Sequence, residues 1–239
     1  MAIKHSTTFL LKKLHQFTGI VPLGIFFFAH MFTNSKAVNG EAAFEKAVQD
    51  IHDIPYLLFI EIFGIFLPLL YHSIYGVIIS MEARPNVMAY SYGRNWFYLF
   101  QRITGIFLFF FILFHVLNLR FGLIPGLNLT PVAGNANLSW DIVAAEFAIP
   151  WVLVLYLLGI AATAWHLAYG FWLFAVDWGI IIGVRAQKYA LYACVAMAFG
   201  LFVVGANAAF AFLRPCGLLP QALCEQKVSA VTRPAPNIL

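Results

Sequence analysis

The sequence predicts an all-α integral membrane protein with five transmembrane helices, the first four of which form a bundle built on an internal two-helix repeat. Hydrophobic residues make up 62% of the chain and charged residues only 10%, whereas soluble domains average about 25% charged residues. A chain with so little charge does not supply the polar surface that a water-soluble fold needs. Five long apolar stretches, and a motif shared by the second and fourth of them, complete the prediction.

Each apolar stretch is long enough to cross a membrane as a helix, because about 20 residues rising 1.5 Å each span the ~30 Å hydrocarbon core. The expected spans, in one domain of residues 1–213, are residues 17–33, 57–81, 96–121, 147–176 and 189–213. A tail of residues 214–239 follows. The first span is interpreted as a retained helix and not a signal peptide, since no small-residue cleavage pattern follows it.

Basic residues are more numerous on the side of the membrane that holds the amino terminus. That side has Lys4, Lys12, Lys13, Arg84, Arg94, Arg102, Arg185 and Lys188. The other side has Lys36, Lys46, Arg120, Arg214, Lys227 and Arg233. The positive-inside rule therefore predicts a multi-pass protein of the inner (plasma) membrane with a cytoplasmic amino terminus. No basic cluster is dense enough to follow a phosphate backbone, which excludes nucleic-acid binding.

The three cysteines have no CxxC spacing, so they indicate neither a zinc site nor an iron–sulfur cluster. The predicted topology places Cys216 and Cys224 in an oxidising compartment outside the cell, where a disulfide is chemically permitted. Their spacing leaves open whether it forms. Cys194 falls within the fifth span and is expected to be an inert thiol.

Four of the seven histidines lie within the predicted membrane spans, one in each of the first four: His30, His72, His115 and His166. Ionisable side chains at this depth are rare and usually have a partner. For any single one, a packing histidine bonded to a neighbouring helix is the simpler interpretation. His5, His15 and His52 fall in or beside aqueous segments and are interpreted as solvated or interfacial residues.

The spans repeat in pairs, and the repeat predicts how the histidines pair. In the first and third spans a glutamine precedes the histidine by 14 residues, with a Thr-Gly pair between them. In the second and fourth spans the histidine begins the same motif, H-x-x-Y-G. Equivalent spans run in the same direction, so equivalent histidines lie at the same depth.

The helical rise places His30 and His115 in an outer layer and His72 and His166 in an inner layer, about 15 Å apart along the membrane normal. Each layer supplies two axial ligands for one planar cofactor. A bare metal in a helical bundle normally has carboxylates or a third histidine, which these layers lack. Two haem b groups are therefore predicted, one for each layer, suited to electron transfer because both axial positions of the iron are filled.

Five further residues are candidates for contacts with these cofactors. Gly76 and Gly170 lie one helical turn after the inner histidines, where glycine allows a macrocycle to approach the backbone. Gln16 and Gln101 lie near the edge of the inner haem, where they are expected to bond its propionates or a quinone. Arg102 reaches the interface through its long side chain. Ordinary helix packing and lipid phosphate are the alternatives for these residues.

Several motifs resemble one known family, the five-helix di-haem cytochrome b membrane anchors of succinate dehydrogenases and fumarate reductases. The resemblance covers roughly residues 14–188. It rests on GIFFFAH ending at His30, EIFGIFLPLLYH ending at His72, SYGRNW from Ser91, QRITGI from Gln101, and WHLAYG containing His166.

The resemblance implies that His30 and His115 bind the distal haem and that His72 and His166 bind the proximal one. It also implies a flavoprotein subunit and an iron–sulfur subunit on the cytoplasmic face. The chain would then pass electrons between the iron–sulfur subunit and a membrane quinone, expected to be of the menaquinone type. It would have no residue catalytic for succinate. The direction of the reaction and the residues of the quinone site stay open.

Two other functions compete with this one. Intramembrane histidines also relay protons in transporters, but the spans hold almost no other charge, Glu61 being the main acid. The chain is also compatible with the cytochrome b subunit of another quinone-linked oxidoreductase.

Overall fold

The computed structural model describes residues 2–82, 84, 86–219 and 224, with only the backbone described for residues 2–6. The described residues form helices and connecting turns without a strand. In chain order the elements are α1 (Ala2–Ile20), α2 (Pro22–Ser35), η1 (Lys36–Asn39), α3 (Glu41–His52), α4 (Leu57–Ile60), η2 (Glu61–Phe66), α5 (Leu67–Glu82), α6 (Gly93–His115), η3 (Val116–Arg120), η4 (Ala136–Leu138), α7 (Ser139–Phe147), α8 (Pro150–Asp177) and α9 (Val184–Ala211).

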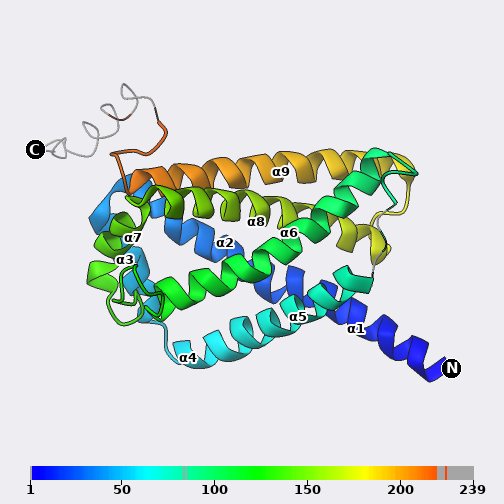
Figure 1. The fold of residues 1–239 in the computed structure, drawn as a ribbon, viewed down its shortest axis with the longest axis horizontal. Coiled ribbons are helices and arrows are strands. Elements are labelled where there is room, and N and C mark those ends of the chain that lie inside the picture. Colours follow the sequence, from blue (N-terminus) through cyan, green and yellow to red (C-terminus); the bar gives the residue numbers. More distant parts are fainter. Residues whose placement is uncertain (1, 83, 85, 220–223, 225–239) are drawn as a thin grey trace, which may run out of the picture.

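Five stretches of these helices are long and apolar enough to cross a membrane, which confirms the predicted fold class. They are Thr7–Asn39, Leu57–Glu82, Gly93–Arg120, Pro150–Asp177 and Val184–Ala211. Successive spans alternate in direction, and the start of α1 and the end of α9 lie at opposite ends of the bundle (Figure 1). Large apolar side chains point outward along them, for example Phe110 at 63% exposure and Phe199 at 70%. Such a surface suits lipid and not water.

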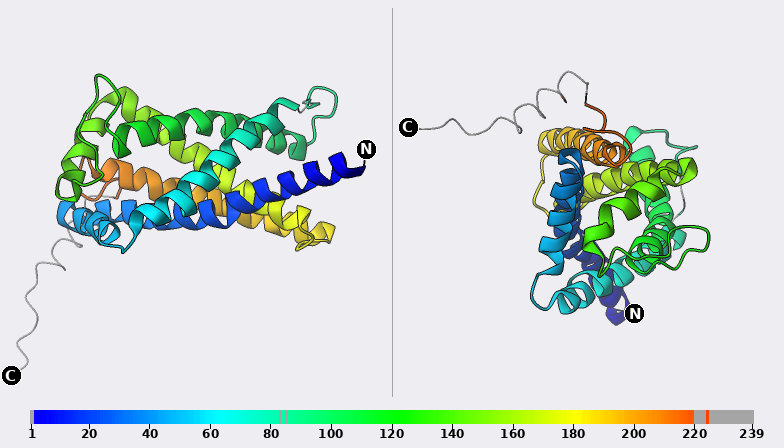
Figure 2. Two further views of the ribbon diagram at one scale, coloured as in Figure 1. Left: turned by 90° about the horizontal axis from the view of Figure 1, so that it is seen from below. Right: turned by 90° about the vertical axis from the view of Figure 1, so that its left-hand side faces the viewer.

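The first four spans form a closed ring. α1 contacts α5, α5 contacts α6, α6 contacts α8, and α8 contacts α1 again. The fifth span, α9, stands outside this ring and packs against α8 and α2 (Figure 2). Spans that are two apart in sequence therefore face each other diagonally across the axis of the ring.

Several spans depart from a regular α-helix. The first bends between α1 and α2, where Pro22 occupies the first helical position and has no N–H to donate. The second and third contain π-helical segments, η2 and η3. An ion pair joins these two segments, with Arg120 Nη2 2.7 Å from Glu61 Oε2. Glu61, the main acid expected within the spans, is thus paired with a cation.

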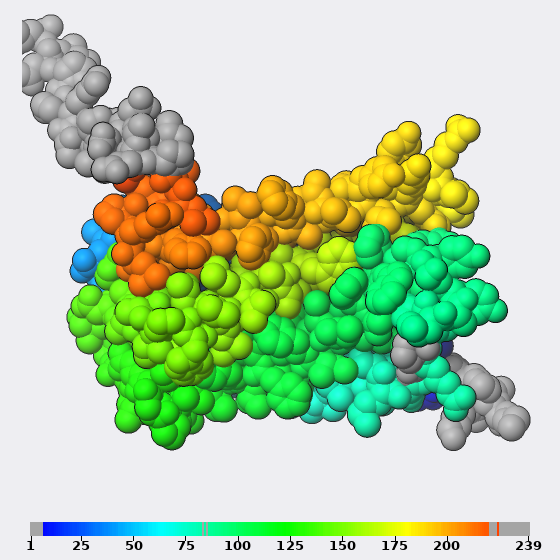
Figure 3. All heavy atoms as spheres, turned by 45° about the horizontal axis from the view of Figure 1, so that its top comes forward, coloured from blue at the N-terminus to red at the C-terminus, as the bar shows by residue number. Residues whose placement is uncertain are grey.

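Some helices extend beyond the predicted spans, the first one most, and the loops contain short helices of their own. Hydropathy placed the start of the first span at residue 17, but α1 already begins at Ala2. The helix continues through the lysines that precede residue 17, because their charged ends can reach water while their backbone stays helical. α3 and α7 fold against the end of the bundle opposite the amino terminus, here called the cap end (Figure 1). Phe44 of α3 and Phe147 of α7 are both buried there. The space-filling view shows the cap end as a compact mass at the end of the elongated body (Figure 3).

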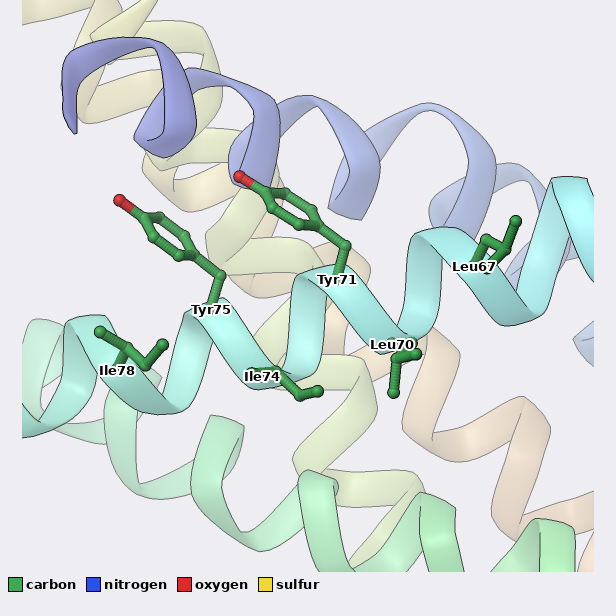
Figure 4. Close-up of a pocket in the computed structure, with 6 residues that line it drawn as sticks. All are labelled: Leu67, Leu70, Tyr71, Ile74, Tyr75 and Ile78. Carbon is green, nitrogen blue, oxygen red and sulfur yellow. The ribbon is translucent and has the colours of Figure 1, made fainter. Parts of the chain in front are cut away.

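The second span also presents a shallow apolar groove toward the outside. Figure 4 shows its lining along α5, with Tyr71 and Tyr75 directed toward α1. The Tyr71 hydroxyl donates a 2.8 Å hydrogen bond to the Leu11 carbonyl. This bond fixes α5 against α1 near the amino-terminal end of the bundle.

A disulfide joins Cys216 and Cys224, whose Cα atoms are 5.8 Å apart, just after α9 at the cap end. The pairing that the sequence left open is thus present in the structure. Cys194, half-buried in α9, is a free thiol, as expected. Lys227 and Arg233, which entered the charge comparison, lie outside the described residues.

The disulfide and the predicted topology lead to one test. In intact cells carrying Cys194→Ala, a membrane-impermeant maleimide should label the protein only after mild reduction, because the two remaining thiols are bonded and face outward. Labelling of the oxidised protein would contradict the disulfide. Labelling that requires opened cells even after reduction would contradict the orientation.

Candidate functional site

The four intramembrane histidines meet in two pairs inside the ring. The ring centroids of His30 and His115 are 5.8 Å apart, and those of His72 and His166 are 6.3 Å apart. The imidazole planes are nearly perpendicular, at 81° in the first pair and 88° in the second. Each pair joins diagonal spans, so both lie across the bundle axis. The structure thus brings together the histidines that the repeat pairs, while their ligation of a cofactor stays a prediction.

This spacing fits two imidazoles that share one metal ion. Nitrogen ligands about 2 Å from a central metal put the centroids of two opposed imidazoles roughly 6 Å apart. Among the described residues no group of three or more His, Cys, Asp or Glu side chains is arranged to hold a metal ion. Each pair thus offers two imidazole nitrogens as possible metal ligands.

Hydrogen bonds orient the inner pair. His72 Nδ1 lies 2.9 Å from the His15 carbonyl oxygen, and His166 Nδ1 lies 3.2 Å from the Gln101 carbonyl oxygen. Carbonyl oxygens only accept, so Nδ1 must carry the proton in both rings. Nε2 then keeps its lone pair, and no described group hydrogen-bonds it. Such an arrangement fixes the tautomer that binds a metal.

The Thr-Gly pairs noted in the sequence make room for this inner pair. Gly19 in α1 contacts the imidazole of His72 so closely that a Cβ would overlap it. Gly105 in α6 contacts His166, where a Cβ would come within 3.0 Å of Cε1. Thr104 adds a hydroxyl 3.2 Å from His166 Nδ1. The sequence displayed these pairs, but only the packing reveals that each serves the histidine of the next span in the same repeat.

The outer pair has different surroundings. His115 Nδ1 lies 3.2 Å from the Tyr156 hydroxyl, a contact for which the sequence gave no signal. Phe111 stacks on the same imidazole at a centroid distance of 6.1 Å. Phe26 stacks on His30 at 5.5 Å. The outer imidazoles are thus held mainly by aromatic side chains, with a single polar contact.

His15 was expected to be solvated or interfacial, and that interpretation was wrong. Its ring stacks on the ring of His72 at 4.0 Å with an angle of 10° between the planes. His15 Nδ1 is buried without a hydrogen-bond partner among the described residues. The bend between α1 and α2 and the packing of α1 on α5 turn this face inward, which hydropathy does not detect. His52, at the end of α3, is partly exposed as expected.

The contacts align the two repeats differently from the glutamine spacing in the sequence. Thr18 and Thr104 are equivalent, because each hydroxyl donates to the carbonyl three residues earlier, which in turn faces an inner histidine. This alignment pairs Gln101 with His15 and not with Gln16. Twelve residues separate Thr18 from His30, but eleven separate Thr104 from His115. The extra residue falls where Pro22 bends the first span.

The two glutamines have different partners. Gln16 donates from Nε2 to Asp177 Oδ2 at 2.7 Å and accepts at Oε1 from Trp178 Nε1 at 2.9 Å. Gln101 donates to the His166 carbonyl at 2.9 Å, and its Oε1 is buried without a partner among the described residues. An unpaired acceptor suits a hydroxyl donor better than a carboxylate. A role in binding propionate or quinone stays a prediction for both.

The other candidates pack against protein side chains. A Cβ at Gly76 would come within 3.0 Å of His15 Cε1, and one at Gly170 within 3.7 Å of Gln101 Nε2. Arg102 lies over the ring of Tyr98, with Cζ 4.0 Å from the centroid. The expected contacts of these three residues with a cofactor stay predictions.

The fold and the site define a multi-pass helical membrane protein with two metal-competent histidine pairs inside its bundle. Comparison with known proteins identifies a family of transmembrane subunits. Residues 80–205 match the family described as succinate dehydrogenase/fumarate reductase transmembrane subunit. The chain is also 37% identical over 205 residues to the succinate dehydrogenase cytochrome b558 subunit of Bacillus subtilis (strain 168), which covers 86% of this chain and 97% of that protein. The chain belongs to the family of succinate dehydrogenase and fumarate reductase transmembrane subunits.

The close contact at Gly105 predicts a specific sensitivity. Gly105→Ala should lower the stability of the purified protein by about 1–3 kcal/mol, because the added methyl group forces the His166 imidazole to move. Gly200→Ala is the matched control, since a Cβ there meets nothing within 4 Å. Thermal unfolding in detergent measures both. Equal unfolding temperatures for the two variants would contradict the packing of Gly105 on His166.

Proposed function

We propose that this chain is the membrane anchor and electron-transfer subunit of a succinate:quinone oxidoreductase and that it holds two haem b groups between its histidine pairs. His30 and His115 bind one haem, and His72 and His166 bind the other. The observation that carries the proposal is the pair of imidazole–imidazole separations, 5.8 and 6.3 Å, at positions related by the repeat. Family membership and the cytochrome name of the Bacillus subtilis relative support it.

Haem iron with two imidazole ligands exchanges single electrons with little movement of its ligands and has no open site for oxygen. The residues of the chain prepare the two sites for this chemistry. The carbonyls of His15 and Gln101 hold the protons of His72 and His166 on Nδ1, so Nε2 of each imidazole keeps the lone pair that would bind the iron. The lipid-facing side chains around the ring keep water from the bundle interior.

The partners proposed for the chain are those of its family. A flavoprotein subunit and an iron–sulfur subunit bind on the cytoplasmic face, next to the inner haem, and a membrane quinone of the menaquinone type exchanges electrons with the chain. The amino-terminal end of the bundle is the cytoplasmic one. The excess of basic residues at that end supports this orientation in the plasma membrane.

A proton-relay transporter is the competing function, and the structure gives it little support. Glu61, the main intramembrane acid that the sequence offered, forms an ion pair with Arg120. The described side chains of α8 between Pro150 and Val176 include no acid at all. The histidines therefore have no carboxylate chain along which to pass protons through the fourth span.

Histidine variants of the assembled complex test the proposal. His30→Ala and His115→Ala should each abolish or shift the same one of two haem signals, and His72→Ala and His166→Ala the other, because each haem loses one axial ligand. Low-temperature absorption spectra during redox titration separate the signals. His52→Ala is the control and should change neither.

Accumulation of each variant is measured first, since loss of a ligand can block assembly. If His30→Ala affects the same signal as His72→Ala, the proposed pairing is wrong. If the wild-type protein shows no haem absorption, or fails to purify with a flavoprotein that oxidises succinate or reduces fumarate, the function itself is wrong.

A further inference from the structure

A buried carboxylate lies close to the outer histidine pair without any role in the function proposed above. Glu146, in the cap helix α7, is only 2% exposed. Its Oε2 accepts a 3.1 Å hydrogen bond from Asn118 Nδ2, and its Oε1 accepts a 2.9 Å bond from the backbone N–H of Asn128. Neither donor is charged, and no described side chain forms an ion pair with Glu146. Burying an unpaired carboxylate is costly, so its retention needs an explanation.

Polar contacts connect this carboxylate to His115. Asn118 is 1% exposed and lies in the π-helical segment η3, three residues after His115. Its Nδ2 donates to Glu146 and its side chain lies next to the Tyr156 hydroxyl, but its Oδ1 has no hydrogen-bond partner among the described residues. Tyr156, 6% exposed, lies 3.2 Å from His115 Nδ1. The imidazole, tyrosine, amide and carboxylate thus form one buried polar series, in which hydrogen bonds join His115 to Tyr156 and Asn118 to Glu146.

If His115 binds a metal through Nε2, the donor and the acceptor of its contact with Tyr156 are fixed. Nδ1 then carries the proton and donates to the Tyr156 oxygen. Asn118 donates its amide hydrogen to Glu146. At the far end Glu146 accepts hydrogen bonds at both oxygens, as a carboxylate does.

Among the described residues, no hydrogen bond joins the inner imidazoles to a carboxylate. His72 and His166 donate to backbone carbonyls, which are neutral. Hydrogen bonds that end on a carboxylate make a histidine ligand more basic and favour the more highly charged state of the metal. The two layers therefore differ in the groups behind their ligands, not in the ligands themselves.

We propose that Glu146 is a positioning residue that acts through Asn118 and Tyr156 on the His115 imidazole and lowers the reduction potential of the outer haem relative to the inner one. The proposal rests on the function proposed above, because it requires His115 to be a haem ligand. It assigns to the cap helix α7 a second role besides closing the end of the bundle.

Redox titration of the assembled complex in native membranes tests this role. Glu146→Gln keeps the shape and removes the charge, so the outer haem should become reduced at a higher potential, with a several-fold larger reduced fraction at a fixed potential. The inner haem should not change. Asp141→Asn is the matched control, because it removes the same charge from an exposed position of the same helix, and it should leave both haems unchanged.

Tyr156→Phe tests the connection between Glu146 and His115 independently. It replaces Glu146→Gln as the test if that variant does not accumulate. It removes the hydroxyl next to His115 and should shift the outer haem in the same direction. In the Tyr156→Phe background, Glu146→Gln should shift the potential of the outer haem less than it does alone, because the effects of coupled residues are not additive. An unchanged outer potential in either single variant, or an equal shift of both haems, overturns the proposal. The His115→Ala spectra identify the outer haem, so a failure here is distinct from a failure of the haem assignment.

Discussion

The pairing of imidazoles across the bundle axis is the constraint on which the rest of the structure depends. A histidine inside a membrane must have its polar nitrogens satisfied, because lipid provides no hydrogen bonds. In this chain Nδ1 of His72 and Nδ1 of His166 bond to backbone carbonyls, which leaves Nε2 of each imidazole with its lone pair. At each of two depths, two imidazoles lie about 6 Å apart. This placement requires the four-helix ring, the diagonal arrangement of equivalent spans, and glycines at positions 19 and 105.

The sequence was sufficient to predict the five spans and the histidine pairs, because both depend on features that are local or repeated. Hydropathy over about 20 residues identifies a span without reference to its neighbours. The repeat identifies which spans are parallel, and parallel spans place equivalent histidines at one depth. His30 therefore meets His115, and His72 meets His166, as predicted.

The remaining site contacts depend on how helix faces turn, which hydropathy does not specify. His15 is polar and close to lysines, so it was placed in water, yet the packing of α1 on α5 brings it onto His72. The bend at Pro22 shifts the register of the first span by one residue, and counting back from His30 therefore matched the wrong residue with Gln101. Glu146 falls just outside the predicted fourth span, but α7 folds inward over the cap end and buries it.

The position of α9 has a consequence for how the chain is assembled. A ring made of four consecutive spans has a single seam between elements that are distant in sequence, where α1 meets α8. The fifth span packs against α8 on one side of this seam and against α2, the continuation of α1, on the other. During synthesis the earlier parts of a chain fold first, so the seam closes only when the fourth span has entered the bilayer. The fifth span then packs across the closed seam and stabilises the four-span ring.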